Sequence, residues 1–403
     1  MSKSSLREAT SASQTPSTFD LQIPNPAPLL NEIARRYESP ERILMEFVDN
    51  GLDDAEALYR ANADAYPFEI RIEVILDISQ RTVVVRDNCR GMRRETLERI
   101  VEKVGQSQKA GLTWVNGRFG FGVHAFRAAS ESIRFRTKHA DDQLIELHLS
   151  REQRRGIRRP WEVSEPFPTD TGTGTEVTVG PFDEEWFETI SADSIRREIE
   201  RHFERLLARP NLSITVQEVS EQAVRCEPFD YAQVPGEEFE RTVDLELNGR
   251  LYPVEIRLKV SEIEIPDRAA RFFARGRRIN EIAEIKSFIR KSLHRTSIWG
   301  HPHLLGSIEV GEVVRPVITR DDFQQTKGRT VLYEAILGLE EEIKKALYKD
   351  QFYSRYGRQP ERRDQMFDEQ VEFICRLETA LRPRLPLLQQ EFNGNGGEEA
   401  TDE

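Results

Sequence analysis

The stretch at residues 41–57, ERILMEFVDNGLDDAEA, decides how the rest of the chain is interpreted. Because a helix turns once every ~3.6 residues, Glu46, Asn50 and Asp53 fall on one helix face. The remaining surface of the helix is largely apolar, with Ile43, Leu44, Phe47, Val48 and Leu52. A carboxylate and an amide one turn apart are suited to activating a water and holding a hydrated Mg2+ beside a phosphate. The same spacing is common on solvated helix faces, so this stretch alone leaves both interpretations open.

The composition indicates a globular protein with room for two domains. The chain has 403 residues, of which 38% are hydrophobic and 32% charged. No apolar run is long enough to span a bilayer and the N-terminus lacks an apolar signal segment, so we expect a cytoplasmic protein without membrane contact. Three distant cysteines predict reduced thiols rather than a disulfide framework or a zinc site. Residues 1–20 and the acidic residues 393–403 are expected to be disordered.

The net charge of -12 works against nucleic-acid binding by the whole surface. The charge is nevertheless uneven, with locally basic runs at residues 151–159, 268–278 and 286–295. Each run is interpreted either as a solvated face or as a contact for DNA. DNA therefore stays a candidate partner.

Periodicity and turn residues predict alternating helices and strands along the chain. The expected helices cover residues 26–37, 41–65, 94–104, 123–129, 191–207, 282–293, 329–349 and 361–382. The expected strands cover residues 69–76, 82–86, 132–138, 144–149, 212–219, 240–247, 251–260 and 304–310, and a further strand follows Gly174-Thr175. Asn248-Gly249 is a strong signal for a hairpin turn.

Three further motifs surround the opening stretch. A turn, Asp87-Asn88-Cys89-Arg90-Gly91-Met92, follows a strand. A glycine-rich stretch at residues 105–122 runs directly into a helix, where backbone N–H groups can approach an anion, and a loop of this length is typical of a lid or a binding loop. Gly174-Thr175 then enters a strand.

In this order the four motifs resemble the GHKL ATPases, which include gyrase B, the MutL repair proteins, the heat-shock chaperones, the sensor histidine kinases and the MORC proteins. The resemblance covers residues 25–210. It implies an α+β fold class, with a Bergerat-type α/β sandwich that binds ATP at residues 21–210. Histidine kinases fit less well, because their ATPase domain comes last and about 190 residues follow it here.

The resemblance implies a role for each motif residue on the metal and adenine sides. Glu46 is the expected general base and Asn50 the expected side-chain ligand of Mg2+. Asp53 is expected to position waters on the adenine side. Asp87 is expected to accept the adenine amino hydrogen. The residues expected to shape or support this pocket are Gly91, Met92 and Thr175.

On the phosphate side, the resemblance implies backbone donors from Gly117, Gly120 and Gly122. The same segment adds Lys109, Phe121 and Val123 to the expected ATP-binding set. His124 has two interpretations, a phosphate contact or a histidine on the helix surface. One departure concerns Cys89, which stands where the family usually has glycine. If that position requires a positive φ, Cys89 is strained and the affinity for nucleotide is reduced.

The second half of the chain resembles the transducer domains of gyrase B, MutL, MORC and topoisomerase B subunits. The resemblance implies a ribosomal-protein-like α/β domain at residues 211–350 and a helical C-terminus at 351–392. Gln325-Thr326-Lys327 precedes a helix and looks like the element that sends a lysine to the γ-phosphate, so Lys327 is the expected switch lysine. The alternative is an exposed loop lysine.

Together these features predict Mg2+-dependent ATP binding and slow hydrolysis that drive homodimerisation, as in an ATP-gated clamp. No nuclease motif, topoisomerase tyrosine domain or zinc finger is apparent, so we expect a partner protein to carry effector activity. The alternative is an ATP-sensing scaffold or chaperone-like protein with little or no hydrolysis.

Overall fold

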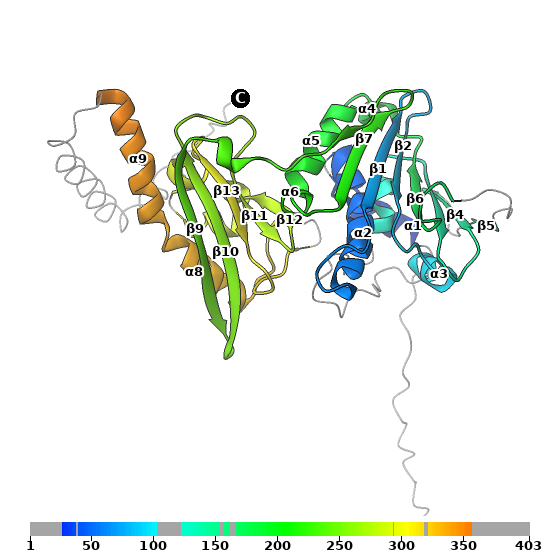
Figure 1. The fold of residues 1–403 in the computed structure, drawn as a ribbon, viewed down its shortest axis with the longest axis horizontal. Helices are drawn as coiled ribbons and strands as arrows, with labels where there is room; N and C mark the ends of the chain where they lie inside the picture. The colour runs from blue at the N-terminus through cyan, green and yellow to red at the C-terminus, as the bar shows by residue number, and fades with distance from the viewer. Residues whose placement is uncertain are drawn as a thin grey trace, which may run out of the picture.

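The computed structural model describes residues 26–37, 39–102, 122–152, 157–160, 167–292, 294–317 and 321–356. Two mixed α/β units follow one another along the chain, and each is built on its own sheet (Figure 1). The α+β class expected from the sequence is confirmed. Among the described residues, no helix is both long and apolar enough to cross a membrane.

The expected central helix is present as α2, Pro40–Ala61. Its first turn is set by Ser39, whose hydroxyl accepts a hydrogen bond from the Arg42 N–H at 3.3 Å, and by Pro40, which is tolerated where no intrahelical donor is needed. The five apolar residues noted in its sequence are all buried. Burial of this face against the sheet fixes which side of α2 meets the rest of the first unit.

The first sheet has eight strands in the order β5-β4-β3-β6-β2-β1-β7-β8. Their bounds are β1 Ile70–Asp77, β2 Thr82–Asp87, β3 Ser132–Lys138, β4 Ile145–Ser150, β5 Ile157–Pro160, β6 Gly174–Val179, β7 Leu212–Glu218 and β8 Val224–Arg225. Neighbouring strands are antiparallel except β1 and β7, which are parallel. Alternate residues of β1 are buried, as expected for a sheet covered by helices on one face.

The other helical segments of the first unit complete its core. They are α1 Ala27–Ala34, α3 Arg94–Glu102, η1 Gly122–Ala128, α4 Glu184–Phe187, α5 Ala192–His202 and α6 Glu204–Leu207. The single helix expected at residues 191–207 is interrupted at Phe203, whose φ of -114° and ψ of 18° are not helical. Phe203 is fully buried, and α5 and α6 lie between the first sheet and the second unit (Figure 1).

The first unit extends past residue 210, the boundary expected from the sequence. β7 pairs with β1 along its whole length, from Ile70 opposite Leu212 to Leu76 opposite Glu218, and β8 extends the same sheet. Pro210 does end the helical region, but the strand after it contributes Leu212, Ile214 and Val216 to the first core. The boundary therefore falls after Cys226, which is still buried in the first core, rather than before Leu212.

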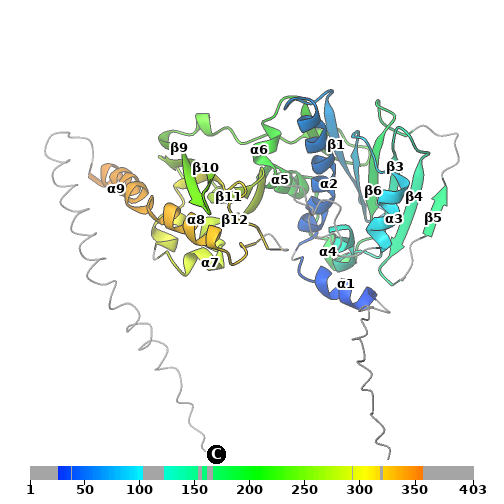
Figure 2. The same ribbon diagram turned by 90° about the horizontal axis from the view of Figure 1, so that it is seen from below.

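The second unit is a five-stranded sheet in the order β12-β11-β13-β10-β9. Its strands are β9 Gly236–Leu247, β10 Arg250–Ser261, β11 Ala270–Ala274, β12 Arg277–Glu281 and β13 Leu304–Glu309. Its helical segments are η2 Tyr231–Gln233, η3 Ile282–Glu284, α7 Lys286–Ile289, η4 Arg295–Trp299, α8 Lys327–Leu337 and α9 Glu340–Tyr356. Helices α7, α8 and α9 lie on one face of this sheet (Figure 2).

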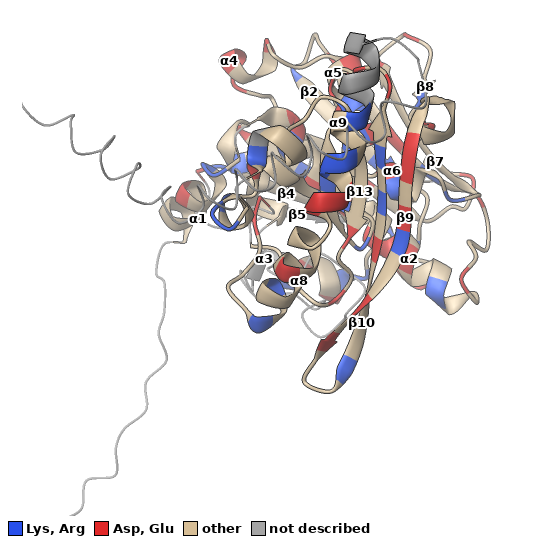
Figure 3. Cartoon of the chain, turned by 90° about the vertical axis from the view of Figure 1, so that its left-hand side faces the viewer, with Lys and Arg blue, Asp and Glu red and all other residues tan. Residues whose placement is uncertain are grey.

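The hairpin expected at Asn248-Gly249 is confirmed, since both residues have positive φ, 54° and 74°, and join β9 to β10. Basic and acidic residues are interspersed on the side that carries β9 and α9, so this side has no face of a single charge sign (Figure 3). The relation of this unit to ribosomal-protein-like transducers stays a prediction. The expected helix at residues 361–382 and the two expected disordered ends lie outside the described residues.

The basic run at residues 268–278 is not an exposed surface. It forms β11, a turn and the start of β12, strands that the sequence did not predict, and Arg271 and Arg277 are each only 1% exposed. Acidic side chains of the first unit meet these charges, including Glu204 beside Arg268 and Asp49 beside Arg277. The interpretation of this run as a DNA contact is therefore wrong.

Candidate nucleotide-binding site

Glu46 and Asn50 lie on the half-buried face of α2, as the helical spacing predicts. The Asn50 amide makes no side-chain hydrogen bond with the described residues. Gly122, the first residue of η1, lies against Glu46: a Cβ atom at Gly122 would be 2.5 Å from Glu46 Oε2. The glycine thus lets the η1 backbone approach the carboxylate of the expected general base.

Asp87 ends β2 and lies against the same helix. A Cβ atom at Gly51 of α2 would be 3.4 Å from the Asp87 Cβ. Asp87 Oδ1 accepts the backbone N–H of Cys89 at 3.0 Å and that of Thr175 at 3.3 Å. Burial, followed by the charge of Asp54, raises the pKa of Asp87 to about 7. The carboxyl group is therefore fixed in position and near half-ionised at neutral pH.

Three neighbouring strands place Asp87, Thr175 and Thr137 side by side. Asp87 on β2 is opposite Thr175 on β6, and Thr175 is opposite Thr137 on β3. The Thr137 hydroxyl accepts the backbone N–H of Met92 at 2.7 Å and lies 3.1 Å from both the Gly174 carbonyl oxygen and Thr175 Oγ1. Sequence reasoning missed Thr137, although a threonine at an inward position of an alternating strand was a usable signal.

The backbone around the row of Asp87, Thr175 and Thr137 requires glycine at positions 91 and 174. Gly91 has a φ of 72°, and a Cβ there would lie 2.2 Å from the Lys138 carbonyl oxygen. Gly174 has a φ of 140°, and a Cβ there would lie 2.1 Å from the Asp87 carbonyl oxygen. The two glycines let the turn after β2 approach β3 and β6 closely, while Met92 is half-buried against the core.

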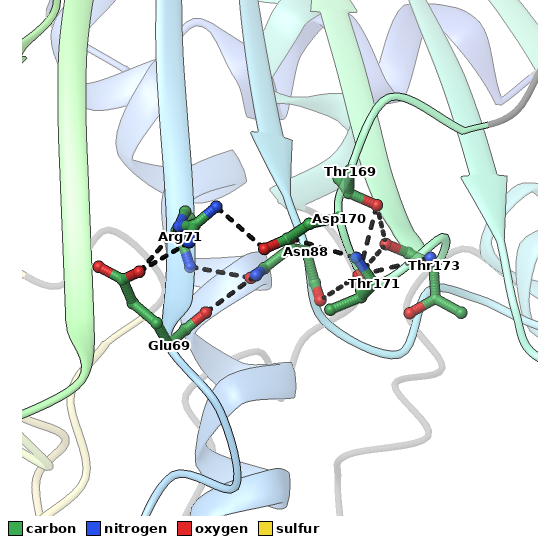
Figure 4. A network of polar contacts seen from close by, with 7 residues as sticks. All are labelled: Glu69, Arg71, Asn88, Thr169, Asp170, Thr171 and Thr173. Atoms are coloured by element: carbon green, nitrogen blue, oxygen red, sulfur yellow. Dashed lines mark hydrogen bonds and ion pairs between the residues drawn. The ribbon is translucent and has the colours of Figure 1, made fainter.

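A polar network connects the turn after Asp87 to the start of β1 and to the loop before β6 (Figure 4). The buried Asn88 side chain accepts the Arg71 backbone N–H at 2.8 Å and donates to the Glu69 carbonyl oxygen at 2.9 Å. The Thr171 hydroxyl donates to the Asn88 carbonyl oxygen at 3.2 Å, and Arg71 pairs with Asp170 at 3.0 Å. The turn is thus fixed between the start of β1 and the loop before β6, a contact that the sequence did not predict.

Cys89 is not strained. Its φ is not positive, its side chain is buried, and its Sγ lies 3.7 Å from the Gly51 carbonyl oxygen. Thr173 Oγ1 donates to the Cys89 carbonyl oxygen at 2.7 Å. Burial raises the pKa of the Cys89 thiol, which stays neutral. The expectation of strain at this position is therefore wrong, because it is Gly91, two residues later, that adopts the left-handed conformation.

His124 is buried within η1, so the interpretation as a surface histidine is wrong. It is 5% exposed, and its Nδ1 accepts a hydrogen bond from Arg127 Nε at 3.3 Å. Burial, followed by the charge of Arg127, lowers the pKa of His124 to about 4. The ring is therefore neutral at physiological pH and carries its hydrogen on Nε2, which has no hydrogen-bond partner among the described residues.

The Asp53 carboxylate is bound by the second unit. Its side chain is fully buried, and its Oδ1 accepts a hydrogen bond from Arg277 Nη2 of β12 at 3.1 Å. The expected role of Asp53 in an adenine-side water network stays a prediction, and the structure adds an ion pair with the second unit. The helical spacing was correct, but Asp53 also lies on the neighbouring face with Asp49.

The remaining predicted residues have no described contact with Glu46, Asn50 or Asp87. Val123 is half-buried against the first core. Lys327 is exposed at the first residue of α8, and it makes no hydrogen bond or ion pair with any described residue. The segment before it is anchored to the second unit, where the Ser287 N–H donates to Asp322 Oδ2 at 3.0 Å. Lys109, Gly117, Gly120 and Phe121 lie outside the described residues.

The donor set fits Mg2+ and an adenine nucleotide. Among the described residues there is no group of three or more His, Cys, Asp or Glu side chains that could hold a metal by itself. A single free amide oxygen fits Mg2+, which keeps waters and takes phosphate oxygens as further ligands. Gly51, which follows Asn50 on α2, lies against Asp87, whose fixed carboxyl group can accept an amino hydrogen of adenine.

The first unit is thus an α/β sandwich in which a helix with a carboxylate and an amide lies against a carboxyl group at the end of a sheet strand. Residues 37–168 match the sequence model of the family described as histidine kinase-, DNA gyrase B-, and HSP90-like ATPase. The first unit of this chain is therefore an ATPase domain of the GHKL superfamily.

Similarity to individual proteins is confined to part of the chain. The chaperone protein HtpG of Coxiella burnetii, in the strains RSA 331 / Henzerling II and RSA 493 / Nine Mile phase I, is 28% identical over 138 residues. The match covers 29% of this chain and 21% of the chaperone, so the chain spans about a fifth of the length of the curated relatives it matches.

Proposed function

We propose that this protein binds ATP with Mg2+, hydrolyses it slowly, and uses the cycle to close and open a homodimeric clamp. The observation that carries the proposal is the contact of Gly51 with Asp87. Through it, one helix joins an acceptor for the adenine amino group to the carboxylate and the amide needed at the phosphates. A Cβ atom at Gly51 would already lie 3.4 Å from the Asp87 Cβ, so α2 packs closely against the end of β2 at this point.

Each side chain then has one task. Asp87 accepts the adenine amino hydrogen, while Thr137 and Thr175 hold the turn that frames the base. Asn50 supplies an oxygen ligand to Mg2+, which neutralises phosphate charge when bound. Glu46 orients the attacking water and accepts its proton. The backbone of Gly122 and the Nε2–H of His124 are donors on the phosphate side.

The second unit converts the state of the nucleotide into movement. Lys327 would have to reach the γ-phosphate from the start of α8, where its charge would stabilise the transition state and report the presence of that phosphate. Closure and opening of such a gate limit turnover more often than chemistry does, so turnover should be slow. The client is a protein or DNA, brought by a partner chain with effector activity. The similarity to a chaperone supports a protein client, and the exposed Lys286, Arg290 and Arg295 support DNA.

The proposal is tested with Glu46→Ala. We expect the variant to retain ATP binding in calorimetry, to lose phosphate release, and to elute as a dimer with ATP in size-exclusion chromatography, because it binds ATP but cannot leave the closed state. Glu32→Ala, which removes an exposed carboxylate of α1, is the control and should match the wild type. Phosphate release from Glu46→Ala that equals that of the wild type and exceeds a blank without protein would remove Glu46 from the mechanism.

The alternative is an ATP-sensing scaffold with little or no hydrolysis. The sequence feature that favoured it was Cys89, and because Cys89 adopts an ordinary backbone conformation we favour hydrolysis. The same assay separates the two functions. If the protein is a scaffold, the wild type releases no more phosphate than the Glu46→Ala variant, although both bind ATP equally well.

A further inference from the structure

One edge of the polar face of α2 is bound, through Asp49 and Asp53, by an arginine of the second unit. Arg277, the first residue of β12, donates from Nε to Asp49 Oδ1 at 2.6 Å and from Nη2 to Asp53 Oδ1 at 3.1 Å. Its Nη1 donates to the Arg275 carbonyl oxygen at 2.9 Å. All three guanidinium nitrogens therefore have partners. Two of these partners, Asp49 and Asp53, lie on α2, the helix that carries the expected base and metal ligand.

This cluster is removed from water. The exposed fractions of the side chains are 1% for Arg277, 3% for Asp49 and 0% for Asp53. Burial alone would disfavour the charged guanidinium, but Asp49 and then Asp53 outweigh it, so the pKa of Arg277 is raised. Removal of the arginine would therefore take a cationic partner from two buried carboxylates, which is strongly destabilising.

The turn before Arg277 is seated on the first unit. Gly276 has a φ of 74°, and a Cβ there would lie 2.9 Å from Leu206 Cδ2 of α6. A glycine is thus needed both for the conformation and for the close approach. The arginine therefore projects from a turn whose position is fixed against the first unit, rather than from a free loop.

The geometry of α2 connects this cluster to the site. Successive residues of a helix are about 100° apart. Around the axis of α2, Asp49 therefore lies about 100° and Asp53 about 60° from Asn50, both on the same side. Asp49 directly precedes Asn50 in the sequence, and Asp53 is one turn further on. Any rotation of α2 that moved Asn50 and Glu46 would therefore stretch both bonds to Arg277.

We propose that Arg277 is a positioning residue for the ATPase site: the second unit sets the rotation of α2, and thereby the placement of Asn50 toward Mg2+ and of Glu46 toward water. The inference rests on the proposed function and deepens it. The metal side of the site is complete only while the two units are in contact. Movement of the second unit withdraws Arg277 and weakens metal binding, while the adenine pocket on β2, β6 and β3 stays intact.

The interface offers a matched control. Arg278, the next residue, pairs with Glu198 of α5 at 2.7 Å and is similarly enclosed, with 13% of its side chain exposed. It bridges the same two units but binds α5 instead of α2. Arg278→Met therefore removes an interface ion pair without releasing the catalytic helix.

The experiment measures binding of an imido-bridged, non-hydrolysable ATP analogue to the full chain by calorimetry, with and without Mg2+. We expect Arg277→Met to reduce the affinity gained on adding Mg2+ by roughly tenfold or more, while the Mg2+-free affinity is unchanged. Arg278→Met should keep the Mg2+ gain of the wild type. Arg277→Lys, which restores the charge but not the forked geometry, should recover only part of the gain.

A combined variant, Asp49→Asn with Asp53→Asn and Arg277→Met, keeps the test decisive if Arg277→Met alone does not fold. Without buried charges it should regain thermal stability yet keep the defect in the Mg2+ gain. A full Mg2+ gain in this variant would show that Arg277 merely neutralises two acids, and would overturn the positioning role alone. Absence of analogue binding by the wild type would instead overturn the proposed function together with this inference.

Discussion

At the scale of single residues, Asp87 is the side chain whose function conflicts most with stability. The pKa of its carboxyl group rises from 3.8 to about 7, chiefly through burial. Between these two values the unfolded chain loses a proton that the folded chain keeps, so stability falls as the pH rises through this window. The shift corresponds to on the order of 4 kcal/mol at pH 8. In the proposed site this cost is explained by the need for an acceptor of the adenine amino hydrogen.

Asp87→Asn should therefore stabilise the protein and abolish nucleotide binding. The amide oxygen can still accept the N–H groups of Cys89 and Thr175, but no buried charge forms. Thermal unfolding should show a gain over the wild type that is small at pH 4 and largest at pH 8, and calorimetry should detect no ATP binding. Asp244→Asn, at an exposed acid of β9 in the second unit, is the control. Unchanged ATP affinity in Asp87→Asn would remove Asp87 from the adenine pocket.

His124 contributes to the pH dependence with the opposite sign. The pKa of its buried ring is lowered from 6.5 to about 4. As the pH falls from 6.5 toward 4, the unfolded chain gains a proton that the folded chain does not, so stability is lost in this window. The stability profile of the wild type combines both groups, which is why the Asp87 effect is defined as a difference between variant and wild type.

At the scale of elements, adjacent positions of α2 bind Arg277 and carry Glu46 and Asn50. The row of Asp87, Thr175 and Thr137 across β2, β6 and β3 is the wall that we propose for adenine. The wall depends on Thr137, whose hydroxyl is fully buried between the turn at Met92 and the start of β6. Since Asp87 and Thr175 lie in register with it, a change at Thr137 reaches the base without touching α2.

Thr137→Val should weaken ATP binding roughly tenfold, because it keeps the shape but leaves the Met92 N–H and the Gly174 carbonyl without their partner. Thr137→Ser should bind ATP within about twofold of the wild type, since it retains the hydroxyl. Titration calorimetry of both variants gives the comparison. Equal loss in the two variants would indicate that the methyl group rather than the hydroxyl matters.

At the scale of the whole molecule, the two units are joined by charged pairs more than by a shared core. Arg268 reaches Glu204 of α6 at 2.5 Å, and Arg205 of α6 reaches Glu255 of β10 at the same distance. The buried residues form two separate apolar clusters, one in each unit. A polar junction of this kind is compatible with relative movement of the units, which the proposed clamp requires.

Lys327→Met should lower the rate of ATP hydrolysis by on the order of 10–100-fold with little change in ATP affinity, because the lysine is exposed and unpaired in this state and would act only after closure. Single-turnover phosphate release measures the rate and calorimetry the affinity. Lys286→Met, at another exposed lysine of the second unit, serves as the control. A large loss of affinity in Lys327→Met would place the lysine in the ground-state site, and an unchanged rate would exclude it as the switch.

The sequence by itself determined the local features of this protein. The α2 helix, the strands of the first sheet other than β5 and β8, and the Asn248-Gly249 hairpin follow from periodicity and turn chemistry within short windows. The closeness of Asp87 and Thr175 could also be expected, because the motif order resembles that of one family fold, whereas the contact of Gly51 with Asp87 was not predicted.

Only the tertiary structure decided which charges meet. Asp53 and Arg277 are separated by 224 positions, and no local pattern links them. Arg271 and Arg277 belong to a run that looks solvent-exposed because its acidic partners come from distant segments. Likewise, β7 joins the first sheet by pairing with β1, and His124 and Thr137 are buried by strands and helices remote in sequence. Burial and pairing depend on the packed arrangement of both units, which a single stretch of sequence does not contain.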